Sequence, residues 1–359
     1  MDTTDVDIEF DEKGYCNYCN RYYNEYVNKY PMDDKKGKIY LENMVSLIKN
    51  SGKGKPYDCM IGLSGGADSS YLAKKVVDLG LRPLAIHFDS GWNSEMSVNN
   101  IEAIVKSLNL DLKTIVCDWD EMRDLQVAFL KASVPNCDIP QDHSFYAILW
   151  KEAAKNNIKF ILSGHNMATE SILPTSWGYK SRDLRYLNGI HKKFGKIKLK
   201  KYPRLGFLGL YIYYPIIKNI KMEFPLDYMS YNKKNAINEL EQTIGWKKYG
   251  GKHHESIFTR FFQSYYLPNK FGYDKRKPHL SSLIVSNQIT RDDALNELSK
   301  DPYNGMNFIQ DKNFVLKKLR ISENEFIEIM TKPPRSYKDY QSNIWLYNFL
   351  GKINNFIKQ

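Results

Sequence analysis

The chain has 359 residues, of which 42% are hydrophobic, enough to bury the core of one large domain or two ordinary ones. No run approaches the roughly 20 consecutive apolar residues of a membrane-spanning helix. The first 15 residues are acidic and polar, unlike a secretory signal. We therefore expect a cytoplasmic protein without a membrane partner.

Lysine and arginine outnumber aspartate and glutamate by 52 to 41, which gives a net charge of +11. Such an excess suits nucleic acid, nucleotide-linked substrates or an acidic protein. It is equally compatible with compositional drift, because Lys, Asn, Tyr and Ile are all abundant. The five cysteines are an odd number in a chain without a secretory signal, which argues against a disulfide framework.

Short apolar runs alternate with helical patterns in the first half of the chain. The predicted strands are 57–63, 83–88, 112–117 and 159–162. The predicted helices between them are about 68–79, 101–108, 121–131 and 143–156. This alternation predicts an α/β fold with a Rossmann-like parallel sheet and right-handed crossovers.

Polar segments follow three of these strands. They are 64–69, 89–93 and 164–166. Ligands of parallel sheets bind beyond the carboxyl ends of the strands, so we expect the three segments to converge on one edge.

The hydrophobic pattern of the sequence changes after about residue 185. Periodicity is weak over 187–235 and returns over 245–300, and the tail 343–357 is patterned as a helix that packs on the core. Within 257–265, one apolar face predicts a helix, and Thr290 with Asp293 predicts a capping box. We therefore expect three parts: an N-terminal C-x-x-C segment (1–30), an α/β domain (55–185) and a mostly helical region (186–359).

The first strand ends in SGGADSS, residues 64–70. The amides around Gly65 and Gly66 can face one concavity, and a helix starting near Asp68 adds its free N–H groups and positive dipole end, which makes an anion site. The loop is neither a Walker A loop nor G-x-G-x-x-G. The plain alternative is a strand-to-helix turn with Asp68 or Ser69 as helix cap.

S-G-G-x-D-S at this place resembles the pyrophosphate-binding loop (PP-loop) of the N-type ATP pyrophosphatases, whose fold is of the HUP, adenine nucleotide alpha hydrolase-like kind. The matching residues are Ser64, Gly65, Gly66, Asp68 and Ser69. SGHNMATES resembles the second nucleotide-site motif of the same families, with Gly164, His165 and Glu170 at the matching positions. The resemblance implies ATP cleaved between its α and β phosphates, with Mg²⁺ bridging them and Asp68 in a catalytic role. We add Asp89, after the second strand, to the nucleotide-binding residues.

Four further stretches are similar to the N-acetyl sugar amidotransferases of bacterial surface-glycan pathways. They are VPNCDIPQDH (134–143), TSWGY (175–179), IHKKFG (190–195) and the block 245–298. Those proteins help make acetamidino sugars for lipopolysaccharide O-antigen and for the pseudaminic or legionaminic acids of flagellin. The resemblance implies that ATP adenylates the acetamido oxygen of a nucleotide sugar or nonulosonic acid, and that ammonia then displaces AMP.

The ammonia has to come from elsewhere. The chain has no cysteine directly after Met1 and no G-x-C-x-G elbow, so no glutaminase motif is evident. The resemblance implies a separate glutaminase subunit like the histidine-biosynthesis amidotransferase, with a cyclase-like companion.

Cations of the 245–298 block are candidates for holding phosphates and developing negative charge. We single out Lys252, Lys270 and Lys277, with Lys275 and Arg276 beside them. The alternative is a solvated basic face. In the 134–143 loop, we expect Asp142 and His143 to bind substrate or to orient ammonia, and a helix-cap neighbour is the equal alternative for His143. Cys137 is a thiolation nucleophile only in a minority interpretation.

Cys16 and Cys19 form a C-x-x-C, which supplies two of the four ligands of a structural zinc site. The resembling family has a second such pair directly upstream. We therefore expect that the natural start lies upstream of Met1 and that the zinc site is completed there. The alternative is two buried free thiols.

Two other classes of function compete with the sugar amidotransferase. A tRNA-modifying PP-loop enzyme of the lysidine or thiolation type would explain the charge, but it needs an RNA surface, and the tyrosines of 202–231 resemble core residues. A non-enzymatic nucleotide-binding partner is disfavoured by the intact SGGADS loop. We therefore expect a sugar amidotransferase without a nucleic acid partner.

Overall fold

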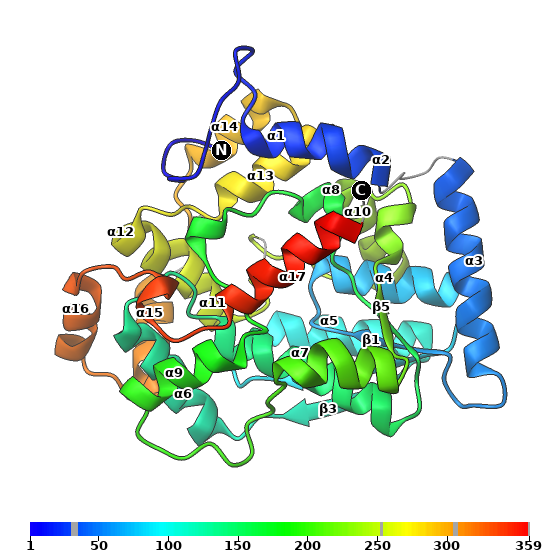
Figure 1. Ribbon diagram of the computed structural model, residues 1–359, viewed down its shortest axis with the longest axis horizontal. Helices are drawn as coiled ribbons and strands as arrows, with labels where there is room; N and C mark the ends of the chain where they lie inside the picture. Colours follow the sequence, from blue (N-terminus) through cyan, green and yellow to red (C-terminus); the bar gives the residue numbers. More distant parts are fainter. Residues whose placement is uncertain (30–34, 252–253, 304–307, 358–359) are drawn as a thin grey trace.

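The computed structural model describes residues 1–29, 35–251, 254–303 and 308–357 (Figure 1). At its centre is a parallel sheet of five strands in the order β3-β2-β1-β4-β5. The strands are β1 (Cys59–Gly62), β2 (Pro83–Asp89), β3 (Asp111–Val116), β4 (Phe160–Leu162) and β5 (Lys221–Glu223). The predicted α/β class with a Rossmann-like parallel sheet is confirmed, and β1–β4 lie at the four predicted positions.

Strand β5 is absent from the sequence-based prediction. It has three residues and lies in the weakly patterned stretch after residue 185, yet it pairs with β4 in parallel, with Ile161 opposite Met222. The sheet therefore continues to residue 223, beyond the end predicted for the α/β domain.

The segments before and around the sheet are mainly helical; η marks 3₁₀ and π-helical segments. They are α1 (Asn17–Arg21), η1 (Tyr22–Tyr26), α2 (Val27–Lys29), α3 (Lys35–Gly52), α4 (Ala67–Asp78), α5 (Glu95–Leu108), α6 (Trp119–Ala132), α7 (Ile139–Lys155), α8 (Met167–Glu170), η2 (Thr175–Trp177), α9 (Leu184–Phe194), η3 (Gly209–Ile217), η4 (Pro225–Tyr228) and α10 (Lys233–Ile244). None of the helices in the described residues is long and apolar enough to cross a membrane.

The rest of the chain is helical, as predicted. Its elements are α11 (Ile257–Phe261), η5 (Phe262–Tyr266), α12 (Leu267–Phe271), α13 (Arg276–Val285), α14 (Arg291–Leu298), α15 (Phe308–Leu319), α16 (Glu323–Thr331), η6 (Tyr337–Asp339) and α17 (Ile344–Ile357). The predicted capping box is present: Thr290 caps α14, and its side chain and that of Asp293 bond reciprocally to the backbone.

Alternate strand residues face two separate cores. Met60, Leu84 and Ile86 belong to one apolar cluster, and Ile61 and Ala85 belong to the other. Helix α7 contacts β1, β2 and β4 on the first side, and α4 contacts β1 and β2 on the second. Because side chains of a strand alternate between faces, the central strands β1 and β2 contribute residues to both cores.

The C-terminal helices share the first core. Phe258, Phe261 and Phe262 are buried in the same cluster as Met60. A bridge between Asn93 and Ser256 joins this region to the segment that follows β2. The helical region is therefore built against the carboxyl end of the sheet.

Candidate nucleotide site at the carboxyl end of the sheet

The glycine loop joins β1 to α4 and is held from two directions. The φ of Gly65 is +82°, and a Cβ there would lie 2.9 Å from the Ser97 carbonyl oxygen. Trp246 Nε1 and Tyr249 OH donate to the Gly65 carbonyl oxygen over 2.9 and 3.0 Å. Both the conformation and the lack of space therefore require glycine at position 65. The Gly65 carbonyl oxygen is already hydrogen-bonded to protein side chains.

The other side of the loop is the start of α4. Its N-cap is Gly66, which has no side chain, so the alternative in which Asp68 or Ser69 caps the helix is wrong. The first hydrogen bond of the helix runs from Ser70 N to the Gly66 carbonyl oxygen. The backbone N–H groups of the first turn therefore have no acceptor within the helix. Ser64 Oγ and Ser69 Oγ lie 3.1 Å apart beside them. Such a turn attracts an anion.

The segment after β4 lies directly against this turn. A Cβ on Gly164 would come within 2.9 Å of the Asp68 backbone carbonyl and 3.0 Å of Ser69 N. Only glycine fits without displacing backbone. The predicted convergence of the segments after β1 and β4 is confirmed.

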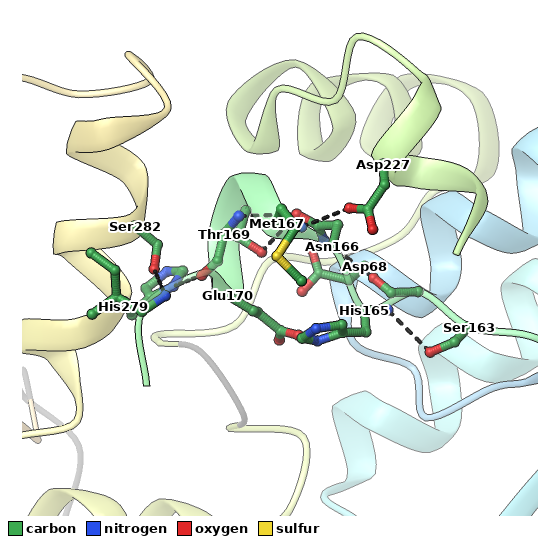
Figure 2. Close-up of polar contacts among 12 residues, drawn as sticks. Asp68, Ser163, His165, Asn166, Met167, Thr169, Glu170, Asp227, His279 and Ser282 are labelled. Atoms are coloured by element: carbon green, nitrogen blue, oxygen red, sulfur yellow. Dashed lines mark hydrogen bonds and ion pairs between the residues drawn. The ribbon is translucent and has the colours of Figure 1, made fainter. Parts of the chain in front are cut away.

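Figure 2 shows the polar residues around Asp68. His165 Nδ1 is hydrogen-bonded to Glu170 Oε2. Asp227 of η4 accepts a 2.7 Å hydrogen bond from Met167 N, and burial raises the pKa of Asp227 to about 6. The site thus gathers carboxylates from three separate segments of the chain.

Two of the residues at this site were missed by the sequence analysis. Asp227 and Tyr231 lie in the stretch of weak periodicity, and the Tyr231 hydroxyl donates to Asp68 Oδ1. No spacing pattern links either residue to the loop, because both reach it through tertiary packing alone.

A third missed residue is Glu255. A Cβ on Gly66 would lie 3.0 Å from Glu255 Oε1, so this carboxylate borders the glycine loop. Its backbone is fixed by the 2.8 Å bond from Ser94 N to the Glu255 carbonyl oxygen. Glu255 therefore brings the C-terminal region next to the glycine loop.

Asp89 shapes the loop after β2. Its Oδ1 accepts from Gly91 N over 2.8 Å and from Asn93 Nδ2 over 3.2 Å. The carboxylate thereby fixes the turn that leads to α5, and its contact with nucleotide stays a prediction.

A second polar cluster lies beside this loop. Ser90 Oγ donates to Gln141 Oε1 over 2.6 Å, and Gln141 Nε2 donates to Asp138 Oδ1 over 2.8 Å. Thr259 of α11 also donates to Asp138 Oδ1, over 3.2 Å. Burial lowers the pKa of Lys275 to about 8, although Asp138 opposes this shift. We call Ser90, Asp138, Gln141, Thr259 and Lys275 the acceptor cluster.

The predicted phosphate-binding cations either have protein partners or fall outside the described residues. Lys270 Nζ donates to the carbonyl oxygens of Ile329 and Lys332, each over 2.5 Å, at the end of α16. Lys277 forms a 2.5 Å ion pair with Asp2. Lys252 falls outside the described residues. The arrangement favours a structural role for Lys270, and phosphate binding by any of the three stays a prediction.

Two residues of the 134–143 loop, Cys137 and His143, are buried. His143 Nδ1 bonds to the Ser181 carbonyl oxygen over 2.8 Å, and Leu205 N donates to Nε2 over 3.1 Å, so both ring nitrogens are engaged by backbone. Burial raises the pKa of the Cys137 thiol. Neither side chain has the exposure that a reacting group needs.

The predicted zinc knuckle is not supported. Cys16 caps α1, and its Sγ lies 3.4 Å from that of Cys19 within a small apolar cluster that includes Tyr18 and Tyr22. Among the described residues, no group of three or more His, Cys, Asp or Glu could hold a metal ion. Within the part of the chain that the structure describes, the two thiols have no third or fourth ligand of the kind that a structural zinc site requires.

Three solved structures illustrate what the chain resembles at low identity. NMN synthetase from Francisella tularensis is 16% identical, with 71% of this chain and 94% of that chain covered and a TM-score of 0.37. U34-tRNA thiolase NcsA from Methanococcus maripaludis is 16% identical, with 73% and 80% covered and a TM-score of 0.36. NH3-dependent NAD synthetase from Campylobacter jejuni is 16% identical, with 76% and 97% covered and a TM-score of 0.31. Likeness at this level says nothing of the reaction that this chain performs.

The comparison with family models is more specific. No curated protein matches the chain. Residues 255–354 match the family described as "LPS biosynthesis protein WbpG-like, C-terminal domain". The match begins at Glu255, the residue that borders the glycine loop, and it places the C-terminal region of this chain with the WbpG-like domains of LPS biosynthesis proteins.

Proposed function

We propose that the chain is an ATP-dependent amidotransferase that converts the acetamido group of an N-acetyl sugar into an acetamidino group, with release of AMP and pyrophosphate. The supporting observation is the proximity of Glu255 to the glycine loop, since a Cβ on Gly66 would lie 3.0 Å from Glu255 Oε1. It joins a loop suited to pyrophosphate with a domain whose relatives belong to LPS biosynthesis. The sugar would be a nucleotide sugar or a nonulosonic acid.

The loop residues fit ATP and Mg²⁺. Gly164 keeps a side chain away from the first turn of α4, where phosphate oxygens would accept hydrogen bonds from the N–H groups. Mg²⁺ is commonly held by one or two carboxylates together with substrate phosphates, and Asp68 is the carboxylate in the first turn of α4. When bound, the cation would neutralise charge on the phosphates.

The reaction has two steps. The acetamido oxygen attacks the α-phosphorus, the bond between the α-phosphorus and the bridging oxygen breaks, and pyrophosphate leaves against the loop amides. Ammonia then attacks the imidate carbon, the carbon–oxygen bond breaks, and AMP leaves with the former acetamido oxygen. The nitrogen loses a proton in this second step.

We assign the acceptor cluster to the second step. Asp138 and Gln141 offer hydrogen-bond partners to an amide or to ammonia. A lysine with a pKa of about 8 is partly neutral near physiological pH, so Lys275 can accept the proton that the attacking nitrogen loses. Ammonia would be supplied by a separate glutaminase subunit.

The test is a product assay. Purified protein is mixed with Mg-ATP, ammonium chloride and a panel of N-acetylated nucleotide sugars and nonulosonic acids, and AMP, pyrophosphate and product mass are followed. AMP formed only with one sugar, together with replacement of oxygen by NH, would support the proposal and identify the substrate. The Asp68→Ala variant should be inactive, and Asp78→Ala, at the far end of the same helix, should be active.

AMP formed only with tRNA would instead assign the chain to RNA modification. The burial of Cys137 disfavours the thiolation branch of that alternative, because its thiol does not reach the thiolate form readily.

A further inference from the structure

An apolar ridge runs along one side of η3. Leu208, Ile212, Ile216 and Ile217 are 68%, 42%, 68% and 66% exposed. These positions recur at helical spacing, so they project from one face. Side chains of this kind are normally buried, and their grouping marks a surface that contacts something apolar.

Helix α17 lies beside η3 and carries exposed aromatic side chains of its own. Tyr347 packs its ring against Phe207 and Tyr211, with centroids 5.9 and 6.0 Å apart, which sets α17 beside η3. Trp345 and Phe349, two residues to either side, are 61% and 57% exposed. Figure 1 shows α17, in red, crossing the near side of the molecule.

The chain around the ridge is strongly cationic. Residues 184–222 contain ten lysines and arginines and no aspartate or glutamate. Lys218 lies over the ring of Tyr213 at 5.5 Å, and Lys180 lies over that of Tyr347 at 4.4 Å. Positive charge therefore touches the apolar surface on both η3 and α17.

A cationic hollow opens next to this surface. Lys151, Lys200 and Arg204 line a volume of about 470 Å³, with Glu152 also present but paired to Lys113. In the described part of the chain, no ion pair joins these three cations to a carboxylate. Burial, followed by the charge of Arg204, lowers the pKa of Lys151. Trp150, next to Lys151 in sequence, packs on Tyr214 of η3 at 6.0 Å, so α7 both lines the hollow and contacts the ridge helix.

We propose that this surface docks the protein on an anionic lipid bilayer, with the ridge in the interface and the hollow facing lipid phosphates. Exposed aliphatic and aromatic side chains beside lysines are the composition of interfacial membrane contacts. Protein interfaces are depleted in lysine, which disfavours a protein partner. A second copy would bring two such cationic segments face to face, which costs free energy by like-charge repulsion. The proposal replaces the expectation that the chain has no membrane partner.

The test is binding of the full chain to vesicles, which needs no turnover and is independent of the proposed reaction. Vesicles of phosphatidylcholine with phosphatidylglycerol should retain the protein at low salt, and vesicles of phosphatidylcholine alone should retain it far less. The double variant Ile216→Glu, Ile217→Glu should lose about tenfold or more in partitioning. Arg204→Gln should lose about fivefold.

Leu295→Glu is the matched control, because Leu295 is 52% exposed on α14, away from the ridge, and its partitioning should be unchanged. A thermal melt verifies that each variant is folded. Absence of binding to anionic vesicles, or equal binding by the double variant, would overturn the proposal. Self-association of the chain that the double variant abolishes, without vesicle binding, would assign the ridge to a second copy.

Discussion

Tyr231 and Asp68 are joined by a hydrogen bond across 163 residues of sequence, from the phenol hydroxyl to a carboxylate oxygen. Asp68 lies in the first turn of α4, and Tyr231 is buried. One oxygen of the carboxylate is thus held in place by a group that cannot swing away. An aspartate that is to meet phosphate-bound Mg²⁺ benefits from such orientation.

The first prediction concerns this bond. Tyr231→Phe keeps the ring and removes the hydroxyl, so Asp68 loses its orientation and kcat/KM for AMP formation should fall by about tenfold to a hundredfold. Steady-state kinetics check this. Tyr57→Phe is the control, because Tyr57 OH also bonds a carboxylate, that of Asp111 at 2.8 Å, before β1 begins. An equal loss in both variants would mean that the effect is one of general stability.

The second prediction concerns Gly164. A Cβ at this position meets the backbone of Asp68 and Ser69, so Gly164→Ala should displace the first turn of α4. We expect AMP formation to fall by about a hundredfold. Gly178→Ala is the matched control, since its Cβ would meet only Asn136 at 3.7 Å, an ordinary contact. Full activity of Gly164→Ala would contradict the close approach of the two segments.

The third prediction separates two roles for Lys270. Because its ammonium group binds carbonyl oxygens at the end of α16, Lys270→Met should lower the free energy of unfolding by about 2 kcal/mol. Turnover per folded molecule should be unchanged. Denaturant titration and kinetics on the same sample measure both quantities, with exposed Lys317→Met as control. A variant that keeps its stability but loses activity would restore Lys270 to the phosphate site.

The fourth prediction is a pH dependence carried by Asp227. Burial raises its pKa in the folded state to about 6, from a model-peptide value near 3.8. The folded state therefore holds this proton more tightly than the unfolded chain does, and stability falls as pH rises from about 4 to 6. The cost at neutral pH is at most about 3 kcal/mol.

Asp227→Asn removes this titration and keeps an oxygen that can accept from Met167 N. The difference in unfolding free energy between variant and wild type, measured at pH 4.5 and 7, should move in favour of the variant as pH rises. A constant difference would show that Asp227 titrates alike in both states.

Local sequence patterns were sufficient to predict four of the five strands. Polar segments mark the ends of β1, β2 and β4, and Thr290 with Asp293 carries its capping signal in four residues. Strand β5 could not be found this way, because three residues such as Lys221–Glu223 contain no full alternation. Its place depends on pairing with β4.

The glycine loop could also be predicted from the sequence, because its glycines are required by the local backbone conformation. Asp227, Tyr231 and Glu255 were not, because each reaches the loop by tertiary packing. Lys270 shows the opposite case, in which a residue was identified from the sequence but its role could not be predicted. A lysine that serves a helix end and one that serves a phosphate have the same sequence context, and only the partner distinguishes them.

Trp246 and Tyr249, which donate hydrogen bonds to the Gly65 carbonyl oxygen, lie 181 and 184 residues after Gly65 in the sequence. During synthesis on the ribosome, the strands β1 to β4 emerge long before the residues that fix the loop between β1 and α4. The nascent chain can therefore assemble its sheet while the loop is still without its distant partners. We therefore expect the glycine loop to reach its final conformation late in translation, after the chain beyond residue 255 has left the exit tunnel.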